Sequence, residues 1–172
     1  MVFKASDMIK IDLKGYSSEV LTPDNAWRYE DVFLSNVEYF LVTDGRLPTK
    51  NDCIDTVNFR IDGMSEDAFL NIGFSVDGKP IACLFLIEGY PVSDVLWIGL
   101  FIVHADHKRG GFGKKCFESL IEAYKGTEIK RIRLSVQGNN ASGFGFWRQV
   151  GFSIIDETDC GNFTNLTMEY VI

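Results

Sequence analysis

The stretch from Trp97 to Tyr124 constrains the fold more than any other part of the chain. An apolar run of strand length, 97–103, is followed by a short polar turn and by glycines at positions 110, 111 and 113. Apolar residues then recur at helical spacing, namely Phe112, Cys116, Leu120, Ile121 and Tyr124. The pattern predicts a strand, a glycine-rich turn and a helix. Because the first turn of a helix carries unpaired N–H groups that glycines leave accessible, such a turn is typical of phosphate binding.

Two common phosphate-binding motifs do not match the spacing of this glycine loop. A P-loop requires glycine at position 108 and a hydroxyl residue at position 115, but both positions hold lysine. A dinucleotide-binding fingerprint requires a third glycine at position 116, where Cys116 stands, and the usual first strand of such a domain is missing upstream. The P-loop is therefore excluded, and the dinucleotide motif is matched only in part.

The remaining elements follow from apolar periodicity and turn residues. Hydroxyl, proline and acidic residues at 22–24 are typical of a helix start, and Asp77-Gly78 is typical of a hairpin. We predict helices over 22–43, 49–61, from 112 onward and over 141–149, and strands over 8–13, 70–76, 81–87, 95–103, 129–136, 152–157 and 163–171. The order is β-αα-βββ-α-β-α-ββ, without a linker or repeat, which predicts one domain over residues 1–172.

The glycine loop resembles the acyl-CoA-binding motif of the GNAT superfamily of N-acyltransferases, Gln/Arg-x-x-Gly-x-Gly/Ala at the start of a helix. The loop has lysine in the first place of that motif and glycines at the two glycine positions. In this family the backbone amides of the loop hold the pyrophosphate of coenzyme A. The resemblance therefore assigns the cofactor to Lys108, Arg109, Gly110, Gly111, Phe112, Gly113 and Lys114.

A second motif of the same family lies downstream. The strand 129–136 is followed by Asn140 and, at the family's spacing, by Phe146, Trp147 and a Gly-Phe pair. Gly143 stands where alanine is common, and Trp147 stands where a tyrosine often reprotonates the thiolate of coenzyme A. An indole N–H cannot give up a proton at a useful pH. The resemblance therefore implies that Asn140, Phe146 and Trp147 contact the cofactor, and the acid step is left without a residue.

The resemblance implies a mixed α/β fold with a splayed, mostly antiparallel sheet of about seven strands and about four flanking helices. The sheet is expected to open where strand 95–103 parts from the next parallel strand, so that the backbone of Phe101, Ile102 and Val103 can pair with the pantetheine arm. The implied reaction transfers an acetyl group from acetyl-CoA to a primary amine by direct attack in a ternary complex. The acceptor site is expected between the helices of 22–61 and the loop 157–162.

Direct attack by an amine calls for a base, and three residues are candidates. Glu88 ends a predicted strand, Asp94 precedes the strand of the glycine motif, and His104 follows that strand. Each also has a structural explanation, as a loop carboxylate or a capping residue. The sequence alone does not choose among them.

Two other functions are compatible with parts of the sequence. A GNAT-like domain without catalysis could bind acyl-CoA as a sensor, since Trp147 replaces the usual tyrosine and no base is obvious. A nucleotide-binding protein could use the glycine loop for ATP or NAD. Release of coenzyme A separates the enzyme from the sensor, and displacement by coenzyme A separates both from the nucleotide-binding protein.

Charge is distributed unevenly along the chain. The net charge is −7, yet residues 104–133 hold eight basic and four acidic residues, which leaves −11 for the rest. A nucleic-acid-binding protein usually carries a basic total, so the basic island suits a small polyphosphate better and no nucleic-acid partner is predicted. The acidic remainder is compatible with a cationic acceptor, either a small-molecule amine or a peptide amine.

Cysteine spacing and hydropathy make further predictions. The four cysteines lie 30, 33 and 44 positions apart without a Cys-x-x-Cys pair, and only two histidines accompany them, so neither a metal site nor a disulfide is predicted. No stretch reaches the roughly 18 apolar residues of a membrane span, and no secretion signal precedes Gly15. We therefore expect a cytoplasmic protein that does not contact a membrane. Exposed strand edges are compatible with a homodimer.

Overall fold

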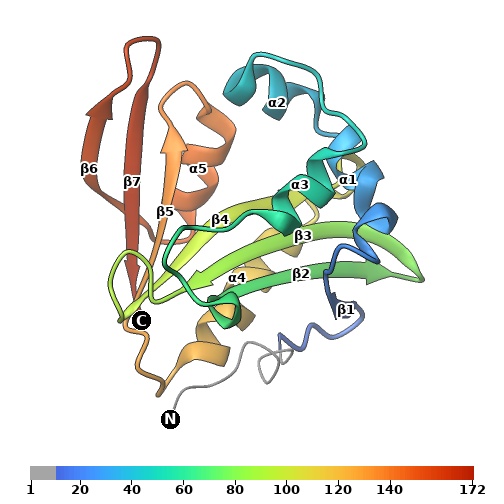
Figure 1. Cartoon of the computed structure of the whole chain (residues 1–172), viewed down its shortest axis with the longest axis horizontal. Helices are drawn as coiled ribbons and strands as arrows, with labels where there is room; N and C mark the ends of the chain where they lie inside the picture. The colour runs from blue at the N-terminus through green and yellow to red at the C-terminus, as the bar shows by residue number, and fades with distance from the viewer. Residues whose placement is uncertain (1–10) are drawn as a thin grey trace.

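The computed structural model of the chain describes residues 11–172 and arranges them around one seven-stranded sheet (Figure 1). The strand order is β1-β2-β3-β4-β5-β7-β6. Neighbouring strands are antiparallel except for β4 and β5, which run parallel. The predicted mixed, mostly antiparallel sheet is confirmed. The strands are β1 (Ser17–Val20), β2 (Phe69–Val76), β3 (Lys79–Glu88), β4 (Val95–Val103), β5 (Arg131–Gln137), β6 (Ser153–Asp159) and β7 (Thr164–Val171).

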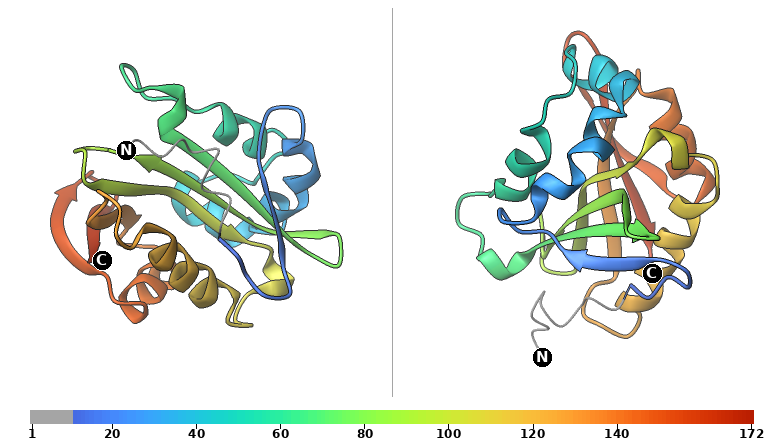
Figure 2. Two further views of the ribbon diagram at one scale, coloured as in Figure 1. Left: turned by 90° about the horizontal axis from the view of Figure 1, so that it is seen from below. Right: turned by 90° about the vertical axis from the view of Figure 1, so that its right-hand side faces the viewer.

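Helices cover both faces of the sheet (Figure 2). One face carries α1 (Glu30–Leu34), α2 (Val37–Asp44) and α3 (Asp52–Asn58), and the other carries α4 (Phe112–Tyr124) and α5 (Ala141–Gln149). The central strand β3 is buried from 81 to 87, as its nearly continuous apolar sequence predicts for a strand covered on both sides. Alternate side chains of β3 therefore enter two separate hydrophobic cores.

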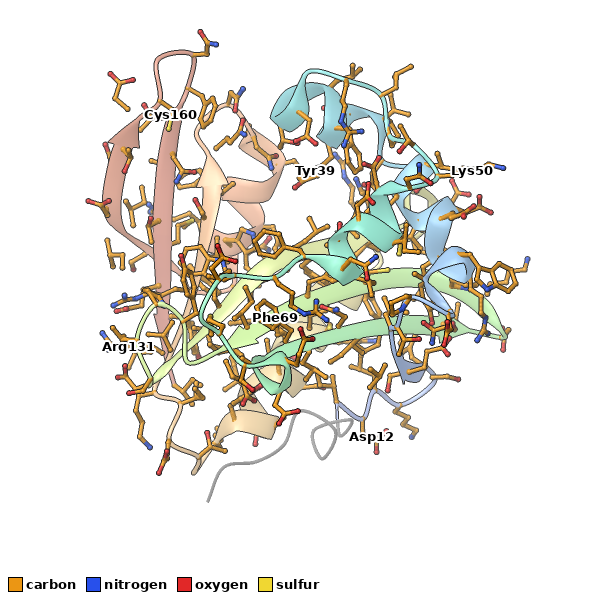
Figure 3. The ribbon with its side chains drawn as sticks, viewed as in Figure 1. Asp12, Tyr39, Lys50, Phe69, Arg131 and Cys160 are labelled. Carbon is orange, nitrogen blue, oxygen red and sulfur yellow. The ribbon has the colours of Figure 1, made fainter. Side chains whose placement is uncertain are left out.

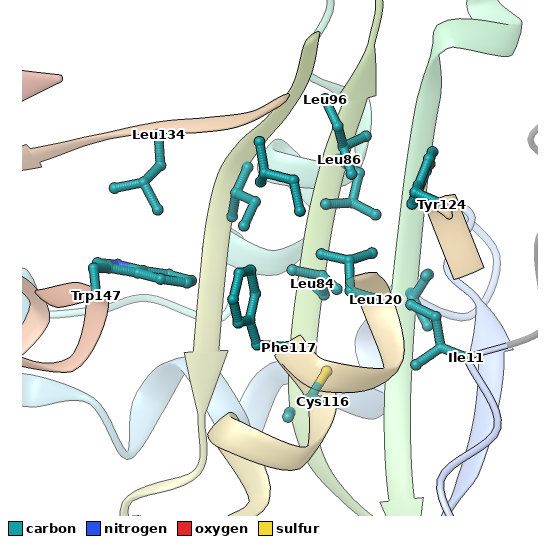
Figure 4. Close-up of a cluster of buried hydrophobic side chains, with 14 of the residues drawn as sticks. Ile11, Leu84, Leu86, Leu96, Cys116, Phe117, Leu120, Tyr124, Leu134 and Trp147 are labelled. Carbon is teal, nitrogen blue, oxygen red and sulfur yellow. The ribbon is translucent and has the colours of Figure 1, made fainter. Parts of the chain in front are cut away.

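The larger core lies beneath α4 and α5 (Figure 4). Helix α4 buries its apolar stripe there, with Phe112, Cys116, Phe117, Leu120 and Tyr124 all facing the sheet. The smaller core lies beneath α1 to α3 and is formed by side chains such as Tyr29, Phe33 and Phe85. The helical spacing of the apolar residues in the sequence thus predicts the face of α4 that is buried.

The predicted first strand over 8–13 is wrong for the part that is described. Residues 8–10 lie outside the described residues, and residues 11–13 do not belong to a strand. Ile11 and Leu13 are nonetheless buried in the larger core, so the alternation reports burial without sheet pairing. The edge strand is β1, which was not predicted and which pairs with β2 through Ser17 to Val20.

The predicted helix over 22–43 is interrupted. A 3₁₀ turn at Ala26–Tyr29 leads into α1, and the chain breaks again between α1 and α2. At this break Asn36 is buried, and its Nδ2 donates to the carbonyl of Val32 at 2.7 Å and to that of Val103 at 2.9 Å. The side chain of Asn36 thus fastens the helical segment to the end of β4, which a continuous helix would prevent. The predicted helix over 49–61 is also shorter, since α3 spans Asp52–Asn58.

One polar contact joins β3 to α4. The hydroxyl of Tyr124 donates to Oε1 of Glu88 at 2.6 Å. Burial raises the pKa of Glu88, and the hydrogen bond from Tyr124 opposes that rise without cancelling it. The contact lies at the end of α4 that is opposite the glycine loop, because Tyr124 is the last residue of the helix.

Gly73 of β2 is required by the close approach of Tyr29. A Cβ atom at position 73 would lie 2.3 Å from Cζ of Tyr29, whose ring is fully buried and whose hydroxyl donates to Glu19 at 2.9 Å. We expect Gly73→Ala to destabilise the protein by about 1 to 3 kcal/mol through overpacking. Thermal unfolding should then begin several degrees lower. Gly145→Ala is the control, since a Cβ there meets no atom within 4 Å; equal melting temperatures for the two variants would contradict the explanation.

A second prediction concerns Glu88. Because its pKa is raised in the folded protein, the unfolded chain ionises first as the pH rises, and the native state loses stability between the ordinary and the raised pKa. Glutamine at this position cannot ionise. The free energy of unfolding of Glu88→Gln, relative to that of the wild type, should therefore increase as the pH rises through the range that begins at the ordinary pKa of a glutamate, about 4.3. Urea denaturation across this range measures the difference, and a difference that is constant or falls with pH would show that Glu88 has no raised pKa.

Candidate functional site

The candidate site lies where β4 and β5 separate. The two strands pair only from Val95 with Arg131 to Ile98 with Leu134. Beyond that point β4 continues along β3, and β5 continues along β7. Figure 1 shows the two halves of the sheet diverging from this point. The facing edges of β4 after Ile98 and of β5 after Leu134 therefore have no strand between them.

A β-bulge marks the start of this opening. Phe85 of β3 pairs with Leu100 and Leu86 pairs with Ile98, so Gly99 is the extra residue in β4. A bulge bends its strand and increases the local twist, which directs β4 away from β5. The bulge was not predicted, although a glycine inside an apolar strand is the ordinary sequence signal for one.

The backbone of β4 beyond the bulge presents free polar groups to the opening. The N–H of His104 donates to the carbonyl of Ile81 at 2.7 Å. Because bonded and non-bonded pairs alternate along antiparallel strands, Ile102 also bonds to β3, whereas the N–H and C=O groups of Phe101 and Val103 face the other way. The carbonyl of Val103 accepts the hydrogen bond from Nδ2 of Asn36 that was described above. The groups of Phe101 face the opening.

The glycine loop follows at the end of β4. Arg109 and Gly111 adopt left-handed conformations, with φ of 63° and 84°. Within residues 11–172, the backbone N–H groups from Arg109 to Lys114 have no hydrogen-bond acceptor, and the first helical bond runs from Lys115 to Gly111 at 3.2 Å. A Cβ atom at position 111 would meet no atom within 4 Å. The start of α4 thus offers consecutive donors and free space, which is the arrangement that binds phosphate.

The basic side chains of the glycine loop add positive charge beside these N–H groups. Lys108, Arg109 and Lys114 are exposed around the unpaired N–H groups. Desolvation lowers the pKa of Lys108, and the carboxylate of Glu38 on α2 opposes that effect. The loop therefore presents positive charge beside its unpaired N–H groups.

Helix α5 forms the opposite wall of the opening. The Oδ1 of Asn140 accepts from the N–H of Gly143 at 3.0 Å and so caps the helix. A Cβ at position 143 would lie 2.6 Å from Nδ2 of Asn140, which explains why glycine and not alanine stands there. Phe146 packs on Gly113, where a Cβ would lie 3.1 Å from its ring. The described contacts of Asn140 and Phe146 are thus structural.

Trp147 is part of the larger core and not of an acid-base pair. Its side chain is 9 % exposed, and its ring centroid lies 6.2 Å from that of Phe101, 6.1 Å from that of Phe117 and 5.1 Å from that of Phe152. Figure 4 shows the indole extending from α5 toward β4. Trp147 therefore forms the apolar backing of the opening.

A large cavity lies on the other face of the sheet, beneath α2 and α3. Its volume is about 560 Å³, and Trp97, Gly99 and Leu100 of β4 form part of its lining. Figure 3 labels Tyr39 on α2 and Phe69 at the start of β2, which both line it. We call this space the acceptor-side cavity. It meets β4 at the bulge, where the opening between the strands begins.

The sequence identifies this cavity only in part. The expected region between 22 and 61 does contribute lining residues, but no residue of the loop 157–162 is among them. The cavity is assembled from α1, α2, α3, β2, β3 and β4, so its residues lie far apart along the chain. Their aromatic character could be read from the sequence, but their convergence could not.

Two side-chain amides connect α2 to the far half of the sheet. The Nε2 of Gln137 donates to the carbonyl of Thr43 at 3.0 Å, and the Nδ2 of Asn139 donates to the carbonyl of Val42 at 3.3 Å. The Oε1 of Gln137 is buried without a partner among residues 11–172. The C-terminal end of α2 thus lies beside the end of β5 and the loop that follows it.

The three candidate bases lie outside the acceptor-side cavity. Glu88 is bonded to Tyr124 on the opposite face of the sheet. Asp94 forms bonds of 2.6 and 2.8 Å with Arg131, and this guanidinium holds the pKa of Asp94 below its ordinary value. The Nδ1 of His104 accepts from the N–H of Asp106 at 3.2 Å, next to the glycine loop. The structure therefore does not bring these three residues together, and their role as bases stays a prediction.

The acidic residues that do line the cavity come from α2 and α3. Arg46 bonds to Asp52 at 2.6 Å and to Asp44 at 3.3 Å. Although burial alone would raise the pKa of Asp52, the bonds from Arg46 and from the N–H of Thr49 hold it below its ordinary value. Asp55 also lines the cavity and has no ion-pair partner in the described part of the chain. The cavity lining therefore carries three carboxylates and one guanidinium, which gives it a net negative charge.

No helix between residues 11 and 172 is both long enough and apolar enough to cross a membrane. In that part of the chain, no group of three or more His, Cys, Asp or Glu side chains is arranged to hold a metal ion. All four cysteines carry free thiols, and Cys160 is exposed.

Solved structures of acetyltransferases share this fold. An acetyltransferase from Thermus thermophilus superposes with a TM-score of 0.76 at 21 % identity, over 91 % of this chain and 97 % of the other. The PaiA N-acetyltransferase of Thermoplasma acidophilum, solved with coenzyme A, gives 0.66 at 16 % identity, over 91 % and 99 %. The ribosomal-protein-S18-alanine N-acetyltransferase of Escherichia coli gives 0.64 at 16 % identity, over 91 % and 94 %. At such identities the likeness shows the fold alone.

Comparison of the sequence with curated proteins gives no significant match. The model of the acetyltransferase (GNAT) family, however, matches residues 31–152. This range contains the bulged strand, the glycine loop and the helix that faces it across the opening. The match covers more than half of the chain and agrees with the fold. The chain belongs to the GNAT family of acetyltransferases.

Proposed function

We propose that the protein transfers an acetyl group from acetyl-CoA to a primary amine by direct attack in a ternary complex. The main support is the separation of β4 from β5 after Ile98. One end of the exposed stretch of β4 leads to the unpaired N–H groups of the glycine loop, and the other end reaches the acceptor-side cavity at Gly99. Two substrates could therefore meet along one strand.

The residues present fit acetyl-CoA. The N–H groups from Arg109 to Lys114 suit a pyrophosphate, and the backbone groups of Phe101 suit an amide of the pantetheine arm. Phe146 and Trp147 supply an apolar wall on the other side of the opening. The neighbour from Thermoplasma acidophilum that was solved with coenzyme A has the same fold. Acetyl-CoA supplies an acyl group activated as a thioester.

The reaction asks little acid-base chemistry of the chain. A neutral amine forms the C–N bond, the C–S bond of the thioester breaks, the amine loses one proton and the thiolate gains one. An acceptor that binds as an ammonium first loses a further proton to water. The N–H of Phe101 faces the opening and is our candidate donor to the carbonyl oxygen. Placement of the two reactants can lower a barrier by about 7 to 11 kcal/mol. Since Trp147 has no proton to give, we assign the return of the proton to water.

A sensor is the alternative. It is favoured by the absence of Glu88, Asp94 and His104 from the residues that line the acceptor-side cavity. Release of free thiol from acetyl-CoA, followed across a panel of amines and peptides, distinguishes the two. Binding of acetyl-CoA without thiol release from any acceptor would favour the sensor, whereas release above the rate of spontaneous hydrolysis would exclude it.

Gly111 provides the sharpest test of the cofactor site. The variant Gly111→Asp puts a carboxylate among the unpaired N–H groups, and we expect the dissociation constant for acetyl-CoA to rise at least about tenfold. Gly63→Asp is a matched control, because Gly63 has the same φ of 84° and equally free surroundings. Calorimetric titration compares the two variants. If both bind acetyl-CoA as the wild type does, the glycine loop is a structural turn and the assignment fails.

A further inference from the structure

The lining of the acceptor-side cavity is unusually rich in aromatic residues. Eight of its nineteen residues are Phe, Tyr or Trp, whereas these residues make up 13 % of the whole chain. Tyr90 and Trp97 meet edge to face at 5.6 Å beside the bulge, and Phe59 is 56 % exposed at the end of α3. Phe33, Phe40 and Phe85 of this set are buried in the smaller core, and the other five rings remain accessible. Accessible rings around a cavity are suited to an aromatic ligand.

The charge of the same cavity favours a cation. Asp44 and Asp52 share Arg46, whose guanidinium also lies over the ring of Phe40 at 5.2 Å. The charge of Arg46 is thus offset by its two carboxylate partners, and the carboxylate of Asp55 adds further negative charge to the cavity. An ammonium group would be attracted, and it would also gain from the faces of the surrounding rings. A carboxylate on the ligand would be repelled.

The cavity is poorly suited to a peptide. An extended peptide is held chiefly by main-chain hydrogen bonds at a free strand edge. Beneath this cavity, β3 is paired on both sides, with Phe69–Asn71 of β2 and with Trp97–Leu100 of β4. The floor therefore offers mainly rings, and its free backbone groups are confined to the unpaired edge of β4 after Ile98. Only the bulge at Gly99 interrupts the pairing.

We infer that the acceptor is an arylalkylamine, a primary amine on a short alkyl chain that ends in an aromatic ring. Its amine lies at Gly99, where the lack of a side chain opens the cavity to β4, and its ring lies among Trp97, Tyr90 and Phe59. The inference rests on the proposed function for the transfer step. Its claim about the cavity can be tested by binding alone.

Calorimetric titration of the full chain with phenethylamine, without acetyl-CoA, is the first test. We expect phenethylamine to bind at least about tenfold more tightly than butylamine, which lacks the ring, and than phenylalanine, which adds a carboxylate. Equal affinity for butylamine would overturn the role of the rings. Equal affinity for phenylalanine, or no binding of phenethylamine at all, would overturn the inference as stated.

Two variants locate the binding. Trp97→Leu should weaken phenethylamine binding at least about fivefold, while Trp27→Leu, which changes a tryptophan that is 66 % exposed outside the cavity, should leave it unchanged. Asp55→Asn should reduce the preference for phenethylamine over phenylalanine, with Asp31→Asn of α1 as the control. If the cavity variants and their controls behave alike, the amine does not bind in this cavity.

Thiol release separates this inference from the proposed function. If acetyl-CoA does not bind and no thiol is released, while phenethylamine binding still depends on Trp97, the proposed function fails and the cavity assignment stands. If thiol is released fastest with butylamine or with a peptide that has a free α-amine, and Trp97→Leu has no effect on it, the acceptor class is wrong and the transferase remains.

Discussion

The loss of pairing between β4 and β5 after Ile98 is the constraint on which the rest of the structure depends. Unpaired backbone groups are costly when they are buried, so a sheet opens only where other partners or solvent can reach its edges. Here the bulge at Gly99 directs β4 away, and the side chain of Asn36 satisfies the carbonyl of Val103. The helical segment between β1 and β2 is broken at the residue that makes this bond. The opening of the sheet and the break in the helix are therefore connected by the hydrogen bond between Asn36 and Val103.

The two faces of the opened sheet differ in charge as well as in packing. The glycine loop presents basic side chains beside its unpaired N–H groups, whereas the acceptor-side cavity holds three carboxylates and one guanidinium. Each region attracts ligands of the opposite sign. An anionic nucleotide-like substrate and a cationic amine would thus be drawn to different faces, and they would meet only at the bulge. This separation also explains how an acidic protein can carry a basic loop.

The sequence predicts the helices and strands whose buried residues form a recognisable local pattern. Apolar runs and glycine spacing predict strand β4, the glycine loop and α4, because these patterns depend on residues that are close together in the sequence. Strand β1 is missed because Ser17–Val20 is an edge strand with few apolar residues, held through Glu19 by Tyr29 and Arg28. The break at Asn36 is missed because its partner, Val103, is 67 residues away. The same limit hides the acceptor-side cavity, which exists only once distant rings converge.

The bonds from Gln137 and Asn139 to the last turn of α2 have a mechanical consequence. They join the half of the sheet that contains β5 to α2, and α2 follows α1, which packs on β3 and β4. The two halves of the sheet are then linked at two places, by the parallel pairing of β4 with β5 and by the hydrogen bonds to α2. These two hydrogen bonds oppose a separation of the halves, which favours a gap that is already formed before a ligand binds. Less ordering is left to be done when a ligand arrives, and binding retains more of its free energy.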